Sequence, residues 1–286
     1  MSSNPDLVLD DAALFENRTE RKYFLAPAQA RGFVDAVSEH LEPHRFRGEG
    51  ASEVPRPVHF ITTLYFDTPS LEIAQACRSG RDNLKLRARE YYDEHPDLAE
   101  LATSHRELVR SSRTVWLELK ARDNHVTRKL RFPLPADEVT GFLAGRELTP
   151  RALELHRREW GARAEDMLDE VRRLCARVEG PLRADCLVHY RRRAWQDQTG
   201  HLRVTLDTRV AYHRPEPDLF HGFTSLRDAV AGPPVARLGS YLVELKLRGD
   251  MPGWLTATVD AAKLEPARIG ERQFSKFLAA SAAVHA

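Results

Sequence analysis

Glutamate and lysine recur two positions apart in segments where the intervening residues are apolar. Glu118 and Lys120 alternate with leucines, and so do Glu244 and Lys246. Residues two apart in a β-strand lie on the same face, so each pair would sit opposite the leucines. Carboxylates bind divalent cations, and such an ion can bridge a carboxylate to a phosphate oxygen. The spacing therefore predicts phosphate chemistry with Mn²⁺ or Mg²⁺, and Glu244 and Glu118 are the candidate metal ligands.

Basic residues follow the same alternation elsewhere. Lys85, Arg87 and Arg89 alternate with apolar residues, as do Lys129 and Arg131. Further charged or polar alternations lie at Glu20 and Lys22 and at Arg203, Thr205 and Asp207. Arginine offers two phosphate oxygens a planar fork and lysine offers a compact charge. Five or six predicted strands thus carry ions at every second position.

Two arrangements of these strands are consistent with the pattern. Any single strand of this kind is more often the solvent-facing side of an antiparallel sheet. Helical segments are also present, however, and they could cover the apolar strand faces so that the charged faces line a barrel. Cations held close together in such a lumen repel one another strongly. An enclosed face of this composition therefore requires a polyanion.

The elements that would position these residues are short strands separated by helices. The predicted strands are Thr19–Leu25, His59–Phe66, Asn83–Tyr91, Thr114–Ala121, Val126–Phe132, Leu187–Trp195, Leu202–Val210 and Tyr241–Leu247. The predicted helices are one that starts at Pro27, Leu153–Val178, Trp254–Leu264 and Phe274–Val284. This order favours an α+β fold built round an antiparallel sheet or a closed barrel.

Composition and motifs narrow the class of protein. The 286 residues carry 43 Lys and Arg against 42 Asp and Glu, so attraction for an anion must come from local arrangement. No apolar run approaches the roughly 20 residues that cross a bilayer, and the three cysteines form no CxxC pair, so we expect a cytoplasmic protein. Residues 1–16 are interpreted as a flexible arm, and residues 17–286 as one domain.

Other nucleotide and metal motifs are missing. The sequence has no GxxxxGK[ST] loop, no GxGxxG fingerprint and no HExxH helix, so side chains must hold the phosphate. The twelve histidines are scattered, and only His189 is a candidate for lining the lumen.

The motifs in their order resemble the VTC domain of polyphosphate polymerases, which belongs to the triphosphate tunnel metalloenzyme (CYTH-like) superfamily. The matching pieces are Glu20-Arg21-Lys22-Tyr23, Tyr65-Phe66-Asp67-Thr68, Lys85-Leu86-Arg87, Glu118-Leu119-Lys120, Tyr190-Arg191-Arg192, Arg203-Val204-Thr205-Leu206-Asp207, Glu244-Leu245-Lys246 and Phe274-Ser275-Lys276-Phe277. They span residues 17 to 280. The order of the pieces, rather than any single one, makes the resemblance specific.

The resemblance implies an eight-stranded antiparallel β-barrel, the triphosphate tunnel, with flanking helices and with Glu244 as a metal ligand. The phosphate-binding residues that it implies are Lys22, Arg87, Arg89, Lys120, Arg192, Arg203 and Lys246, with Lys85 and Arg131 as additions and Lys276 near a tunnel mouth. Of these, Arg87, Arg89, Lys120, Arg192, Arg203 and Lys246 would act in catalysis together with Glu244. Alternation alone leaves the Tyr190–Arg193 stretch ambiguous, and the family motif selects Arg192.

The function implied is metal-dependent transfer of the terminal phosphate of ATP to a growing inorganic polyphosphate chain. Triphosphatase and cyclase relatives carry two glutamates ahead of the first-strand lysine, whereas Arg18 occupies the outer of these positions here. This difference favours the polymerase branch. Two alternatives stay open: a triphosphatase or polyphosphatase that uses the same site, and a non-catalytic polyphosphate sensor. Nucleic acid is the weakest candidate partner, because few aromatic residues are placed for base stacking.

Overall fold

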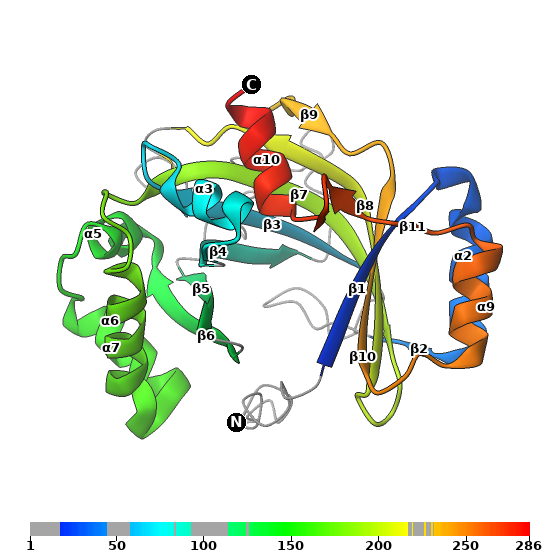
Figure 1. The fold of residues 1–286 in the computed structure, drawn as a ribbon. Coiled ribbons are helices and arrows are strands. Elements are labelled where there is room, and N and C mark those ends of the chain that lie inside the picture. The colour runs from blue at the N-terminus through cyan, green and yellow to red at the C-terminus, as the bar shows by residue number, and fades with distance from the viewer. Residues whose placement is uncertain are drawn as a thin grey trace, which may run out of the picture.

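The protein is built on a strongly curved antiparallel sheet with helices on its flanks (Figure 1). The computed structural model describes residues 18–44, 58–82, 84–92, 114–123, 126–216, 219, 226, 230 and 232–286. The predicted arm at residues 1–16 therefore lies outside the described residues. In these ranges no helix has the length and apolar character needed to cross a membrane.

Each of the eight predicted strands is present. They are β1 (Arg18–Leu25), β3 (Val58–Asp67), β4 (Lys85–Tyr92), β5 (Thr114–Asp123), β6 (Val126–Pro135), β7 (Arg183–Gln196), β8 (Leu202–His213) and β10 (Tyr241–Arg248). Together with β11 (Glu265–Pro266) they pair in the order β11-β1-β10-β8-β7-β3-β4-β5-β6. Two short strands extend the sheet, β2 (Glu42–Pro43) on β7 and β9 (Ala236–Arg237) on β8. The expected α+β class with a large antiparallel sheet is confirmed.

Closure of this sheet into a hydrogen-bonded barrel is not found in the described part of the chain. The pairing runs from β11 at one end to β6 at the other, without a ladder that joins these ends. The free edge of β1 is occupied by the C-terminal segment instead: Tyr23 pairs with Pro266, and the Ala267 amide donates to the Lys22 carbonyl at 2.8 Å. The structure therefore shows a large curved antiparallel sheet, and its closure into a barrel stays a prediction.

One pair of helices covers the sheet beside β1, β10 and β8 (Figure 1). These are α2 (Ala30–His40), which follows the 3₁₀ turn η2 (Pro27–Gln29), and α9 (Gly253–Ala261). Phe33 and Val37 lie four residues apart in α2 and so share one helix face. They are buried in one cluster with Val204, Leu245 and Leu255. The apolar faces of these strands therefore point toward α2 and α9.

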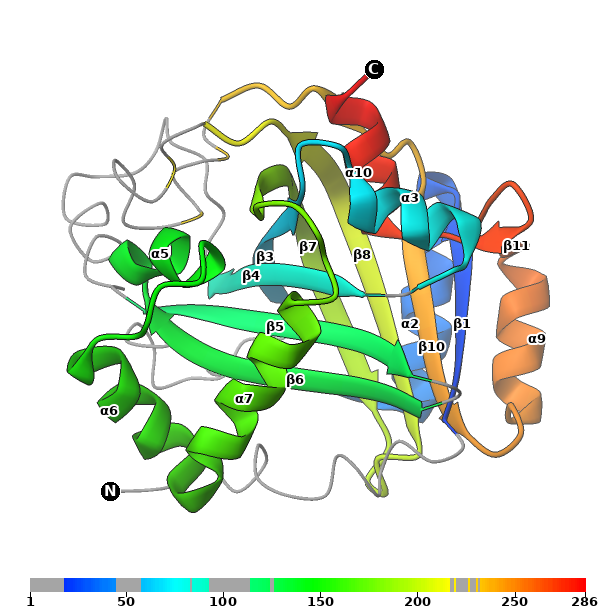
Figure 2. The same cartoon turned by 60° about the vertical axis from the view of Figure 1, so that its left-hand side comes forward.

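A second group of helices covers β5 and β6 (Figure 2). It comprises η3 (Ala136–Glu138), α5 (Val139–Leu143), α6 (Pro150–Trp160), η4 (Gly161–Arg163) and α7 (Ala164–Cys175). The prediction of one helix over Leu153–Val178 is wrong, because the chain turns at Gly161, whose φ of 56° is a conformation that favours glycine. His156 Nε2 lies 2.8 Å from the Ala164 carbonyl and holds this corner.

Asp67 at the end of β3 anchors α3 (Glu72–Ser79), a helix that the sequence did not predict. Its carboxylate accepts hydrogen bonds from the backbone amides of Thr68, Ile73 and Ala74 at 2.7 to 2.8 Å. Asp67 thus joins the end of β3 to the start of α3. These bonds also commit its carboxylate to the backbone.

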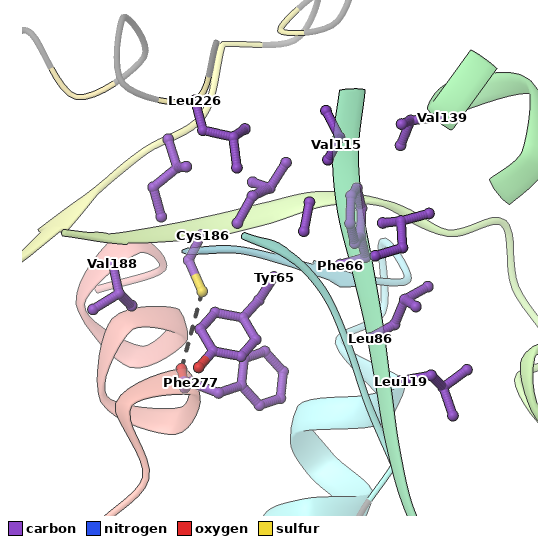
Figure 3. Packing of buried hydrophobic residues seen from close by; sticks show 14 of the residues in the cluster. Tyr65, Phe66, Leu86, Val115, Leu119, Val139, Cys186, Val188, Leu226 and Phe277 are labelled. Carbon is purple, nitrogen blue, oxygen red and sulfur yellow. Dashed lines mark hydrogen bonds between the residues drawn. The ribbon is translucent and has the colours of Figure 1, made fainter. Parts of the chain in front are cut away.

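The last helix, α10 (Lys276–Val284), follows the small hairpin of β12 (Arg268–Ile269) and β13 (Arg272–Gln273). It packs on β7 and β8 and lies beside α3 (Figure 1). The Phe277 and Tyr65 rings lie 5.0 Å apart, and the Cys186 thiol lies 4.0 Å from the Phe277 carbonyl (Figure 3). Tyr65 and Cys186 are paired residues of β3 and β7, so α10 rests on the sheet face that these two share.

Candidate functional site

The strand register places the alternating charges on one face of the sheet. Directly paired residues of antiparallel strands point to the same side. On this rule Lys22 shares a face with Glu244, and Glu244 with Thr205. The predicted residues found on this face are Lys22, Lys85, Arg87, Arg89, Glu118, Lys120, Arg131, Arg192, Arg203, Glu244 and Lys246. We call it the cationic face; it is opposite the apolar faces under the flanking helices.

Curvature of the sheet brings the two ends of the cationic face toward each other. Glu20 of β1 interacts electrostatically with Lys120 of β5, although five strands lie between β1 and β5 in the sheet order. Burial and Glu244 raise the pKa of Glu20, but Lys22, Lys246 and Lys120 together lower it below its usual value. The charged rows of β1 and β5 therefore approach each other across the curved sheet.

Cations of β1 and β4 repel one another across the curved sheet. Burial lowers the pKa of Lys85, and the neighbouring charges of Lys22 and Arg87 lower it further. Burial also lowers the pKa of Lys22, but Glu244 and Glu20 raise it above its ordinary value. A bound anion would relieve the repulsion at Lys85, so this part of the face suits a polyanionic ligand.

Glu244 and Glu20 are the pair of carboxylates best placed to hold a divalent cation. Glu244 is 8% exposed, and its Oε1 lies 2.9 Å from Lys246 Nζ. Burial raises the pKa of Glu244, but Lys246, Lys22 and Arg192 lower it well below the usual range, so it is ionised at neutral pH. Within the described ranges no group of three or more His, Cys, Asp or Glu side chains could hold a metal. Two carboxylates completed by phosphate oxygens are a set that Mg²⁺ accepts, so these residues fit the ion.

Glu118, the other predicted metal ligand, is surrounded by arginines. Its Oε2 accepts hydrogen bonds from Arg87 at 2.6 and 2.8 Å and lies 3.6 Å from Arg89 Nη1. Its Oε1 lies 3.9 Å from Arg131 Nε. Three guanidinium groups on one carboxylate favour a role as their counter-ion over a role as metal ligand. Metal ligation by Glu118 stays an untested prediction.

The environment of Glu118 predicts a pH dependence of stability. Burial raises its pKa, but Arg87 and Arg89 lower it well below the usual value, so unfolding takes up a proton in acid. The free energy of unfolding should therefore be highest above about pH 4.3, the ordinary pKa of glutamate, and fall as the pH drops toward the lower folded value. Urea unfolding at pH 7 to 3 checks this.

The matched variant for that measurement is Glu118→Gln. It should lose about 3 kcal/mol of stability at pH 7, because three arginines lose their counter-ion. It should also show a shallower decline in acid than the natural protein. If the free energy of unfolding fell equally steeply with pH in both proteins, the pH dependence could not be assigned to Glu118.

Lys276 lies at the start of α10 and reaches the cationic face from above the sheet. Its Nζ lies 2.5 Å from Asp207 Oδ2, and Asp207 also binds Arg192. The residues just before it approach the same place: Lys22 Nζ donates to the Phe274 carbonyl at 3.3 Å. Asp207 belongs to the predicted polar alternation, but alternation gives it no role, because its partner Lys276 lies in α10, far along the chain.

Two other residues differ from their predictions. His189 pairs with Thr62, whose neighbours in β3 face the opposite side, and its Nδ1 lies 2.9 Å from Thr62 Oγ1. It therefore lies on the other face of the sheet and does not line the site. Trp116 is on the cationic face, but the Arg131 guanidinium covers its ring at 4.1 Å from the centroid. This contact argues against a free platform for nucleic-acid bases.

Comparison with known proteins found one family and several solved structures. The family model described as the VTC domain matches residues 17–285. The comparison with curated proteins found no match. A putative adenylyl cyclase from Hippeastrum, whose title reports a dominant triphosphatase activity, is 16% identical over 92% of this chain and 94% of its own, with a TM-score of 0.43.

Two further solved structures are similar over most of the chain. A putative adenylate cyclase from Bacillus halodurans is 11% identical over 88% of this chain and 95% of its own, with a TM-score of 0.44. The PH1819 protein from Pyrococcus horikoshii is 11% identical over 86% of this chain and 87% of its own, with a TM-score of 0.33.

Proposed function

This chain belongs to the VTC domain family, and we propose that it is a polyphosphate polymerase that transfers the terminal phosphate of ATP to a growing inorganic polyphosphate chain. The observation that carries the proposal is the convergence of basic residues from β1, β4, β5, β7, β8 and β10 on one face. A single phosphate would need few of these residues, whereas a chain of phosphates would occupy many.

Substrate binding is assigned to the basic side chains of the cationic face. Phosphate oxygens would accept paired hydrogen bonds from the planar guanidinium groups of Arg87, Arg89 and Arg192. Lys22 and Lys246 would supply point charges. Several of these cations are preorganised by ion pairs, such as Arg87 on Glu118 at 2.6 Å. They hold the donor and acceptor phosphates in line, so that little entropy is lost at the moment of transfer.

Phosphoryl transfer on this face needs charge neutralisation more than proton transfer. The transferred group carries its charge on oxygens that Arg and Lys can stabilise, and the terminal phosphate of the acceptor chain is itself an anionic nucleophile. A divalent Mg²⁺ or Mn²⁺ held by Glu244 and Glu20 would add positive charge beside the phosphates. The protein is not required to form a covalent intermediate.

Product analysis tests the proposal. The purified protein is incubated with ATP and Mn²⁺ or Mg²⁺, and the products are separated on a gel that resolves polyphosphate by length. We expect a ladder of long polymer together with one ADP for each phosphate transferred. Free phosphate without polymer would identify the hydrolase alternative instead.

A sensor would show neither product but would bind tripolyphosphate without metal. Nucleic acid is not proposed as a partner, because the face binds the phosphate chain and Trp116 is covered by Arg131.

The cytoplasm is the proposed compartment, since Cys77, Cys175 and Cys186 are free thiols.

A further inference from the structure

A fully buried carboxylate lies within the cationic face, where an acid would repel phosphate. Asp207 of β8 has no exposed side-chain surface. Arg192 of β7 binds it as a fork, with Nε 2.6 Å from Oδ1 and Nη2 2.8 Å from Oδ2. Lys276 of α10 places Nζ 2.5 Å from Oδ2. Both oxygens are thus engaged by cations of the protein, and this leaves Asp207 poorly placed to bind a metal.

The ring of Tyr190 supports the same two cations from another side. The Arg192 guanidinium carbon lies 5.2 Å from its centroid and Lys276 Nζ lies 4.7 Å from it. A cation over an aromatic face is attracted by the quadrupole of the ring. Tyr190 is 1% exposed and is therefore itself fixed by packing. A carboxylate and a ring together restrain both side chains.

This restraint matters because the two cations come from separate elements. Free lysine and arginine side chains lose considerable rotamer entropy when they bind a ligand. A partner that fixes them beforehand removes that loss from the reaction step. Burial raises the pKa of Asp207, but Arg192 and Lys276 lower it below the usual value, so the acid stays charged at neutral pH.

We propose that Asp207 is a positioning residue that, together with Tyr190, holds Arg192 and Lys276 as one preorganised phosphate-binding pair. The inference rests on the proposed function, because it takes these two cations to contact substrate phosphate. It makes α10 part of the site, since the ion pair with Asp207 and the contact with the Tyr190 ring tie the first residue of that helix to β8 and β7. Removal of the Asp207 carboxylate should disturb the alignment of Arg192 and Lys276 with the phosphates, while both positive charges stay in place.

Kinetics of Asp207→Asn, which keeps the shape and removes the charge, test this role. We expect kcat with ATP and Mn²⁺ to fall about 30-fold or more while KM for ATP changes less than about threefold. The affinity for ATP should be kept, because Asp207→Asn removes a negative charge that would repel the phosphates. The matched control is Asp185→Asn: Asp185 is also a buried acid that bonds the C-terminal segment, with Oδ1 2.7 Å from His285 Nε2. Its kcat should stay within about twofold of the natural protein.

A second measurement does not depend on turnover. The Nε–H resonance of Arg192, assigned by its loss in Arg192→Lys, should be sharp in the natural protein and should shift when tripolyphosphate is added. It should be broadened or lost in Asp207→Asn and retained in Asp185→Asn. If the natural protein makes no polymer, the proposed function fails, and this resonance alone decides the inference.

Three results would overturn the inference. One is natural turnover in Asp207→Asn. Another is an equal decrease of kcat in Asp207→Asn and Asp185→Asn, which would reflect a general loss of α10 packing. The third is an Arg192 resonance that is unchanged by the substitution or insensitive to tripolyphosphate.

Discussion

Glu244→Gln should lower the rate of polyphosphate synthesis by about 1,000-fold or more and leave the fold intact. Glutamine has the size of glutamate, but it lacks the charge that the proposed Mn²⁺ or Mg²⁺ requires. Lys22, Lys246 and Arg192, which now lower the pKa of Glu244, would then form a face without this counter-charge. Binding of ATP should therefore persist while turnover is lost.

The measurement for Glu244→Gln combines turnover with metal titration. Initial rates of polymer formation are followed as Mn²⁺ is raised from zero, and urea unfolding verifies the fold. The exposed Glu159 of α6 supplies the matched control, and Glu159→Gln should keep both rate and metal response. A Glu244→Gln protein that synthesises polymer at the natural rate would remove Glu244 from the metal site.

Arg87→Ala is the second large effect that we expect, with kcat/KM for ATP reduced by about 100-fold or more. Arg87 lies on the cationic face between Tyr65 of β3 and Glu118 of β5 in the register. Its loss removes a phosphate fork and also one of the guanidinium groups on Glu118. Arg89 and Arg131 stay near that carboxylate, at 3.6 and 3.9 Å, so the sheet should remain folded.

Comparison with Arg87→Lys separates charge from geometry. Lysine keeps the charge but cannot hold two oxygens in a planar fork, so its kcat/KM should lie between those of Arg87→Ala and the natural protein. Arg157 of α6 is an exposed arginine paired with Glu165, and Arg157→Ala is the control for general loss of positive charge. Equal activity of Arg87→Ala and Arg157→Ala would show that Arg87 has no special role.

Alternation along each strand was enough to predict which side chains share a face. The period of two is a property of the extended backbone, so Lys85, Arg87 and Arg89 could be grouped without any coordinates. Pairing between strands could not be predicted in the same way, because it depends on bonds between residues far apart in the chain. The ion pairs of Glu118 with Arg87 and of Asp207 with Arg192 follow from that pairing, so alternation alone does not predict them.

Local backbone conformation explains where the helices differ from the prediction, whereas closure of the sheet depends on long-range pairing. The break between α6 and α7 depends on the left-handed conformation of Gly161, which the apolar spacing on both sides concealed. Helix α3 is short and is anchored by Asp67 through the backbone. Closure depends on which strand edges pair, and alternation within a strand carries no information on that pairing; in the described residues the Ala267 amide donates to the Lys22 carbonyl at the β1 edge.

That occupation of the β1 edge has a consequence for biosynthesis. Lys22 and Phe274 are hydrogen-bonded although 252 positions separate them, so the ribosome must make nearly all of this chain before they can meet. Contacts of such long range form slowly, after shorter loops have closed. A nascent chain that has reached only β7 therefore lacks the partners of β1 on both sides. The cationic face is therefore incomplete until β10 and α10 have been synthesised.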